Sequence, residues 1–329
     1  MTALATAVMD GRRIVVSGGG DKTVRLWDPA AGASVGEPLT GHLGAVTAVA
    51  TTVLDERPHA VSAGMDGTAR LWDLAAGRQV ACLGRYPARD MSMPIWKLLL
   101  VAFAGPGLHQ EFAVATAKAG ADSVAIVGGA DGAQVWDLAT GEARGAPLTG
   151  DLVMKVATAE LDGRPVVVTS GPVGPIRLWE LDSGAPMGVL PEETGVNRMV
   201  AALAVGKNSG QTVILTTRFH SHQDRGTVQV WDPASCSPVG EPVEVGGPPP
   251  VMMGPMTVIV RDGRSCGVAA VGTPPGRARL VAWDLTTGER VGESQMFPFL
   301  VSALIPDPGG PEGSLVIGFG SEVAILNPC

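Results

Sequence analysis

One short segment of the chain holds three residues of the types that form a hydrolytic triad, namely His42, Ser62 and Asp66. In such a triad the serine hydroxyl attacks an acyl group, the histidine takes its proton and the aspartate orients the imidazole. The same three side chains can instead form a buried hydrogen-bond network that only holds a fold together. The choice between these interpretations depends on the elements that carry the residues.

A second candidate is the run His220, His222 and Asp224, whose alternation would direct all three side chains to one side of an extended segment. Imidazole and carboxylate groups are common metal ligands. Nothing else in the chain supplies a fourth ligand, so we expect a solvated polar loop and predict no metal site and no cofactor. The chain has no P-loop, HExxH, GxSxG or Rossmann glycine motif, and the sequence leaves open whether the protein is an enzyme.

The elements that must position these residues are marked by a repeated dipeptide, because six of the seven tryptophans precede an acidic residue. The pairs are Trp27-Asp28, Trp72-Asp73, Trp136-Asp137, Trp179-Glu180, Trp231-Asp232 and Trp283-Asp284. They are 45, 64, 43, 52 and 52 residues apart, and Leu326-Asn327 stands in the equivalent frame 43 residues further on. A period of about 40–45 residues is typical of a propeller, in which each repeat is one small sheet that cannot bury its own faces.

The most complete copy of the repeat lies between Thr40 and Gly84. Its small and β-branched residues predict four strands, at 46–54, 59–63, 68–74 and 78–83. Asp66-Gly67 supplies the tight turn between the second and third strands, where positive φ is required. The copy therefore predicts one four-stranded antiparallel sheet.

This copy resembles a WD40 repeat. The residues that stand where the family places its Gly-His pair, strand serine, turn aspartate and strand tryptophan are Gly41-His42, Ser62, Asp66 and Trp72. In the family these side chains form a buried hydrogen-bond chain, so the resemblance implies that His42, Ser62 and Asp66 are structural rather than catalytic. The first copy matches in Ser17, Asp21 and Trp27 and has no histidine, and the later copies are less complete.

Seven repeat units follow from this spacing, with third strands expected near 24–28, 69–74, 134–138, 176–181, 227–232, 279–285 and 322–327. We therefore predict an all-β, seven-bladed WD40-type β-propeller that forms a single domain over residues 1–329, with four-stranded antiparallel blades. The third unit is about 20 residues too long for one blade. This excess indicates an insertion around residues 105–122, and it leaves either 111–117 or 123–129 as the second strand of that blade.

The last unit stops directly after its third strand. We expect a three-stranded last blade with an exposed strand edge, which natural proteins usually cover or pair. Either the ring closes by side-chain packing alone, or the edge of blade 7 is a contact surface. We expect a monomer in which this edge remains available for pairing.

Composition narrows the classes of function. The chain has 24 basic and 32 acidic residues and a net charge of −8, which argues against binding to duplex nucleic acid. The longest apolar run, Leu98–Ala104, is far too short to span a membrane, and the first residues do not form a secretory signal. The four cysteines lack metal-ligand spacing, which indicates free thiols in a reducing cytoplasm. The Arg-rich, Lys-poor composition suggests a bacterial source.

The starts of the inner strands give a candidate binding site. In WD40 propellers they surround the mouth of the central channel, together with loops that here are expected at 85–94, 218–226, 245–255 and 272–277. The residues expected at this mouth or in its loops are Trp96, Lys97, Met154, Lys155, Arg198, Met199, Met253, Phe297, Phe299, His220 and His222. An apolar, methionine-rich collar adapts to irregular partners and resembles a small-molecule site. The plainer interpretation is that these are core residues whose cations reach solvent.

Two functions are consistent with this pattern. The first is a cytosolic WD40 propeller that acts as a protein–protein interaction platform, with rigid loops that lose little entropy on binding. The alternative is a small-molecule-binding protein, or a cyclase- or isomerase-like enzyme of natural-product metabolism. In that alternative a small apolar anionic molecule is held at the collar, where Lys97, Lys155 and Arg198 take its charge and a desolvated lysine acts as acid or base.

Overall fold

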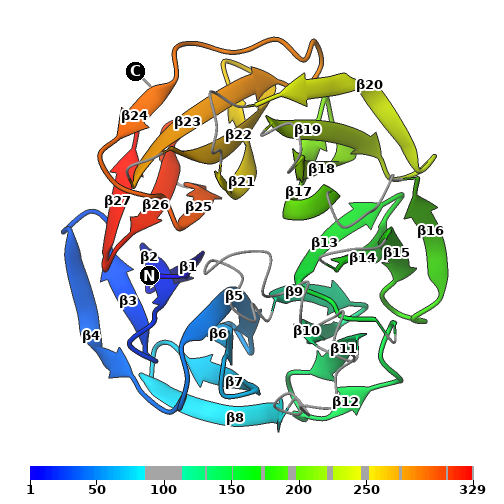
Figure 1. The fold of residues 1–329 in the computed structure, drawn as a ribbon. Helices are drawn as coiled ribbons and strands as arrows, with labels where there is room; N and C mark the ends of the chain where they lie inside the picture. Colours follow the sequence, from blue (N-terminus) through cyan, green and yellow to red (C-terminus); the bar gives the residue numbers. More distant parts are fainter. Residues whose placement is uncertain are drawn as a thin grey trace, which may run out of the picture.

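The computed structural model describes residues 1–85, 113–129, 132–149, 151–171, 175–191, 198–220, 225–245, 252–273, 276–308 and 310–327. Within these residues the chain forms seven antiparallel sheets and no helix. The sheets stand around a common centre like the blades of a propeller (Figure 1). The predicted all-β, seven-bladed propeller is therefore confirmed, with four strands in six blades and three in the last.

Each blade runs from an inner strand at the centre of the ring to its last strand at the rim (Figure 1). The inner strands are β1 (Ala3–Met9), β5 (Val46–Leu54), β9 (Val114–Ala119), β13 (Lys155–Leu161), β17 (Arg198–Asn208), β21 (Met252–Arg261) and β25 (Ala303–Pro306). The second strands are β2 (Arg12–Gly18), β6 (Arg57–Gly64), β10 (Asp122–Gly129), β14 (Arg164–Ser170), β18 (Gln211–His220), β22 (Arg264–Thr273) and β26 (Leu315–Phe319). The third strands are β3 (Val24–Asp28), β7 (Thr68–Asp73), β11 (Gly132–Asp137), β15 (Ile176–Glu180), β19 (Arg225–Asp232), β23 (Arg277–Asp284) and β27 (Glu322–Leu326). The fourth strands are β4 (Ala33–Leu39), β8 (Arg78–Arg85), β12 (Ala143–Arg144), β16 (Pro186–Leu190), β20 (Ser237–Glu244) and β24 (Gln295–Phe297).

Tight turns between the inner and second strands set the register of most blades. In five of these turns both central residues have positive φ, which is the geometry of a type I′ hairpin. The turns are Asp10-Gly11, Asp55-Glu56, Asp162-Gly163, Ser209-Gly210 and Asp262-Gly263. Because side chains alternate along a strand, each turn also fixes which inner-strand residues face each neighbouring blade.

The hydrophobic core lies between neighbouring blades. Trp72 of blade 2 belongs to the same core cluster as Val16 and Val24 of blade 1. In the same way, Trp283 of blade 6 clusters with Leu215 and Val228 of blade 5. Each sheet therefore needs the next sheet to cover it, as expected for a repeat that cannot bury its own faces.

Hydrogen bonds between neighbouring inner strands link four blades around the channel. Thr51 Oγ1 donates to the carbonyl of Thr6 at 2.6 Å, and Thr116 Oγ1 donates to the carbonyl of Thr51 at 2.7 Å. Thr158 Oγ1 continues the series to the carbonyl of Thr116 at 3.2 Å. Each threonine thus satisfies a backbone carbonyl of the preceding inner strand and ties blades 1 to 4 together.

Side chains close the ring between blade 7 and blade 1. The members of the core cluster at this seam include Leu4, Val15, Ala303 and Val316. Arg13 of β2 also donates a hydrogen bond to the buried carboxylate of Asp307, just after β25. Within the described residues β27 is the last strand of its blade, and Figure 1 shows its edge at the rim between β24 and β4.

Two of the expected inner strands are wrong. In blade 3 the inner strand is β9, not a strand that starts at Trp96-Lys97, because a turn at Gly120 (φ 60°) pairs β9 directly with β10. β9 lies within the range 105–122 in which the insertion was expected. In blade 7 the inner strand starts at Ala303, whereas Phe297 ends β24 and pairs with Ala278 of β23.

The expected loops at 218–226 and 272–277 are shorter than predicted, because the strands on both sides extend into them. Arg218 pairs with Thr227 and His220 pairs with Arg225, so β18 and β19 both extend into the range expected for the loop. Thr273 likewise pairs with Arg277. A β-ladder satisfies backbone groups that a loop would leave to water, and this favours the longer hairpins.

Candidate interaction site on the face of blade 2

Four side chains of blade 2 form a continuous hydrogen-bond chain. Trp72 Nε1 donates to Ser62 Oγ at 2.8 Å, and Ser62 Oγ lies 2.7 Å from His42 Nε2. His42 Nδ1 lies 3.1 Å from both carboxylate oxygens of Asp66. Every donor has an acceptor when Ser62 donates to a neutral His42 whose Nδ1–H faces Asp66, so we assign that tautomer. The chain runs from the third strand to the second and then to the loop between β4 and β5.

The charges of this network are set by burial and hydrogen bonding. Burial lowers the pKa of His42 below its ordinary value of 6.5, although the hydrogen bond and charge of Asp66 oppose this shift. Burial alone would raise the pKa of Asp66. Hydrogen bonds from the backbone N–H of Leu43, from Thr68 and from His42 outweigh that effect and lower the pKa to about 2. A neutral imidazole therefore faces a charged carboxylate, and the blade is locked without a buried cation.

The triad-type residues are not arranged for hydrolysis. The side chain of His42 is 0% exposed and Ser62 is 0% exposed. A substrate cannot reach the Ser62 hydroxyl unless the blade opens, and that hydroxyl is already engaged by two partners. The arrangement instead rigidifies the loop and turn that carry His42 and Asp66.

The same tryptophan–hydroxyl contact recurs in other blades with fewer partners. The pairs are Trp27 with Ser17 at 2.8 Å, Trp179 with Thr169 at 2.9 Å, and Trp231 with Thr216 at 3.0 Å. In blade 1 the turn aspartate, Asp21, binds Thr23 and Arg25. In blade 6 the position in register with Ser62 is Ala269, and Trp283 Nε1 is buried without a hydrogen-bond partner among the described residues.

The network of blade 2 presents two exposed apolar side chains at the surface. Leu43 is 76% exposed, and its backbone N–H donates to Asp66 Oδ2 at 2.7 Å. Met65, in the adjoining turn between β6 and β7, is 40% exposed, and its N–H donates to the carbonyl of Ala45 at 2.8 Å. Only glycine fits at position 44 between them, because an added Cβ would lie too close to its neighbours, at 2.6 Å from Asp66 N and 3.1 Å from Met65 Cβ. We refer to these side chains as the Leu43–Met65 pair.

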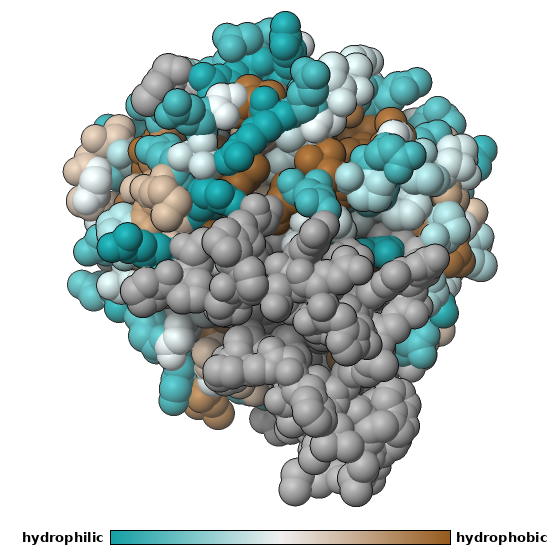
Figure 2. Space-filling view, turned by 45° about the horizontal axis from the view of Figure 1, so that its top comes forward, coloured by the Kyte–Doolittle hydropathy of each residue, from teal (hydrophilic) through white to brown (hydrophobic). Residues whose placement is uncertain are grey.

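In Figure 2 the apolar residues on the coloured part of the molecule form several small, separate areas among polar ones. Single exposed apolar residues are normal on a protein surface. The Leu43–Met65 pair differs because the N–H of Leu43 donates to Asp66 of the network and the N–H of Met65 donates to the carbonyl of Ala45.

Leu43 and Met65 are not among the residues that the sequence predicts for a binding site. The signal that could have identified them is local, since Leu43 stands between His42 and Gly44 in the loop that the network holds. An apolar residue at such a place cannot turn inward, because the adjacent histidine already fills the buried position.

The structure describes only part of the predicted collar. Met154 is buried and its N–H donates to the carbonyl of Ser170, and Lys155 begins β13. Phe297 is buried, and Phe299 stacks on Phe319 with ring centroids 3.9 Å apart. Seven of the predicted residues lie outside the described residues or have side chains outside them, and these are Trp96, Lys97, Arg198, Met199, His220, His222 and Met253. Because Phe297 ends β24, it is part of blade 6 and packs against blade 7, and it does not start an inner strand.

Two further findings concern possible sites of other kinds. Three of the cysteines, Cys82, Cys236 and Cys266, are free thiols, and burial raises the pKa of Cys236 and Cys266. In the part of the chain that the structure covers, there is no helix of the length and apolarity needed to span a membrane.

The family comparison agrees with the geometry. The model described as "WD domain, G-beta repeat" matches residues 2–28 and 33–73. These segments contain β1 to β3 and β4 to β7, the part of the ring in which the tryptophan, hydroxyl and aspartate set is best preserved. None of the curated proteins compared with the chain matches it significantly. The two matched repeats and the seven-bladed ring support a WD40-repeat β-propeller.

Proposed function

We propose that the protein is an interaction platform that binds a protein partner through the face of the ring on which the Leu43–Met65 pair lies. WD40 propellers commonly bind protein partners, and the fold supports this class of function. The observation that carries the proposal is the pair itself, two exposed apolar side chains whose backbone N–H groups are held by hydrogen bonds to Asp66 and to the carbonyl of Ala45. A few well-packed side chains near the centre of an interface usually supply most of its binding energy.

Rigidity is what makes this pair suitable for binding. A loop that is ordered before it meets its partner loses little conformational entropy on association. The His42 network provides that order in blade 2, whereas the equivalent position of blade 6 lacks even the hydroxyl. The most complete repeat therefore also carries the best-held exposed apolar residues.

A variant pair tests the proposal. The tagged protein is purified from its native cells as wild type, as Leu43→Asp and as Val80→Asp. Val80 is a matched control, because it is an apolar residue of the same blade that is 46% exposed on the fourth strand, β8. We expect one or more proteins to co-purify with the wild type and with Val80→Asp, and to be lost from Leu43→Asp.

The opposite pattern would refute the proposal. If Leu43→Asp retains every partner that the wild type retains, this face of blade 2 is not the binding surface. Circular dichroism and thermal unfolding of each variant show that the ring is intact. Both substitutions are at exposed positions, so we expect changes in the free energy of unfolding within about 0.5 kcal/mol.

A further inference from the structure

Seven exposed residues, one from each inner strand, surround one end of the channel. This is the end at which the inner strands turn into the second strands. Each is the next-to-last residue of its strand, or the last residue in blade 7. In ring order they are Val8, Val53, Lys118, Glu160, Lys207, Val260 and Pro306. We call them the rim residues.

The rim is divided into an apolar and a charged part. Blades 6, 7, 1 and 2 contribute only apolar rim residues, of which Val260 is 45%, Val8 61% and Val53 53% exposed. The three blades between them contribute Lys118, Glu160 and Lys207 in that order. The charged part of the rim therefore reads positive, negative, positive across blades 3, 4 and 5.

Both lysines are oriented by their own hairpins. Lys118 Nζ donates to Ser123 Oγ at 2.5 Å, and Lys207 Nζ donates to Thr212 Oγ1 at 2.7 Å. Thr212 Oγ1 in turn donates to the carbonyl of Glu160 at 2.7 Å, which joins two rim positions. Within the described residues neither lysine forms an ion pair with a carboxylate. Their charges therefore remain available to an approaching anion.

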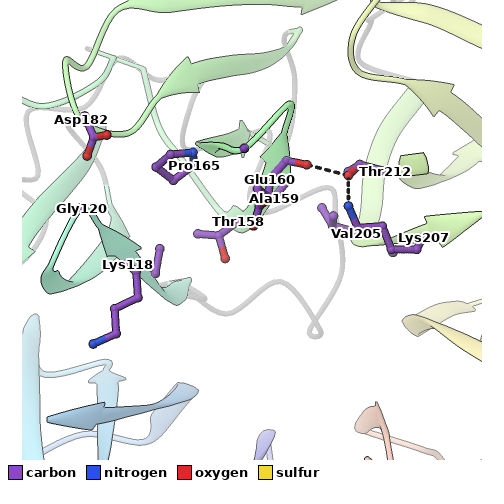
Figure 3. A pocket seen from close by; sticks show the side chains of 13 residues that line it. Lys118, Gly120, Thr158, Ala159, Glu160, Pro165, Asp182, Val205, Lys207 and Thr212 are labelled. Atoms are coloured by element: carbon purple, nitrogen blue, oxygen red, sulfur yellow. Dashed lines mark hydrogen bonds between the residues drawn. The ribbon is translucent and has the colours of Figure 1, made fainter. Parts of the chain in front are cut away.

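A cleft of about 560 Å³ opens between these two lysines, in front of blade 4. Its lining includes Thr158, Glu160, Pro165 and Thr212, and Asp182 adds a second acidic residue from blade 4. Figure 3 shows Lys118 and Lys207 on opposite sides of the cleft, with Thr158 and Glu160 between them. A ligand that contacts both ammonium groups must therefore be elongated.

We propose that this cleft binds an extended segment of a partner protein in which acidic, basic and acidic side chains alternate with other residues. In an extended chain every second side chain points to the same side, so such a segment presents the charges negative, positive, negative along one face. That order is complementary to Lys118, Glu160 and Lys207. The apolar part of the rim then receives apolar residues that flank the segment. This surface lies at the other end of the channel and does not depend on the Leu43–Met65 pair.

Two capped, fluorescein-labelled peptides provide the test. In the first, Glu, Arg and Glu alternate with Thr, and in the second Arg, Glu and Arg alternate with Thr. Fluorescence anisotropy measures their binding to the purified protein at low ionic strength. Exposed ion pairs contribute about two- to fivefold each to affinity, so we expect the first peptide to bind roughly tenfold more tightly. The preference weakens as salt is added.

Charge exchange on the protein keeps the test independent of peptide chemistry. The triple variant Lys118→Glu, Glu160→Lys, Lys207→Glu should reverse the preference between the two peptides. Lys22→Glu is the matched control, because Lys22 is an exposed lysine in the turn between β2 and β3, away from the rim. It should bind as the wild type does. The proposal is overturned if the wild type fails to favour the first peptide, or if the folded triple variant keeps the wild-type preference.

Discussion

The substitution Ser62→Ala tests directly how the blade 2 network stabilises the protein. It removes an oxygen that accepts from Trp72 Nε1 at 2.8 Å and lies 2.7 Å from His42 Nε2. Trp72 and Ser62 are at most 1% exposed, and the side chain of His42 is 0% exposed, so water cannot replace the lost partner. A buried donor and a buried acceptor each cost about 1–3 kcal/mol when they are left unpaired. We therefore expect a loss of about 3 kcal/mol in the free energy of unfolding.

Calorimetry converts this loss into a temperature shift. Unfolding entropy of roughly 2 cal/mol/K per residue gives about 0.7 kcal/mol/K for a chain of this length, so Tm should fall by about 4 °C. Urea unfolding, followed by tryptophan fluorescence, gives the free energy independently.

Two other variants separate the network from a general effect of core substitution. Ser17→Ala removes the equivalent hydroxyl in blade 1, where Trp27 is its hydrogen-bond partner and no histidine takes part, so we expect about half the loss. Ala269→Ser supplies an acceptor to the unpaired Trp283 Nε1 and should stabilise by about 1 kcal/mol. If Ser62→Ala and Ser17→Ala cost the same, and Ala269→Ser gives no gain, the network does not stabilise the blade as described.

Three further perturbations have expected outcomes. The pKa of His42 is lower in the folded state than the ordinary 6.5, so the unfolded chain binds that proton first and stability should fall as pH drops below about 6.5. A second loss of about 2 kcal/mol should follow below pH 3.8, as Asp66 is protonated towards its pKa of about 2. Urea midpoints measured across this pH range report both losses. Arg13→Met leaves the buried carboxylate of Asp307 without its cation at the seam, and should cost about 1–3 kcal/mol by urea unfolding; an unchanged midpoint would show that the ion pair does not hold the ring closed. Gly84→Ala places a Cβ 2.5 Å from the indole of blade 3 and should cost about 1–3 kcal/mol by the same assay, and a neutral result would mean that the two blades separate easily.

The architecture was within reach of the sequence because its signal is repeated. The Trp-acid pairs mark third strands, and β3 at Val24–Asp28 and β5 at Val46–Leu54 agree with the predicted bounds. The three-stranded last blade also follows from counting strands after the last pair. Where one copy departs from the period, as before Trp136, counting could not say which segment pairs with β10. The register of β9 depends on the turn at Gly120, which the repeat does not encode.

The candidate sites were less predictable than the fold. The partners of His42 follow the family pattern. A buried neutral histidine needs an acceptor for its ring N–H and a donor for its other ring nitrogen, and the carboxylate and the hydroxyl of the pattern supply them. The exposure of Leu43 and Met65 depends instead on how two loops meet around Asp66. The rim formed by Lys118, Glu160 and Lys207 combines residues from three repeats, and its charge order is visible only once the inner strands are in register.

Site-specific photo-crosslinking tests the central claim, that a protein partner binds at the Leu43–Met65 pair. A benzophenone amino acid is incorporated at position 43 in one variant and at position 80 in the other, both within blade 2 and both exposed. After irradiation in the native cells, we expect position 43 to yield a discrete covalent adduct with a partner protein and position 80 to yield none. Equal adducts from both positions, or none from position 43 while the partner still co-purifies, would contradict the account.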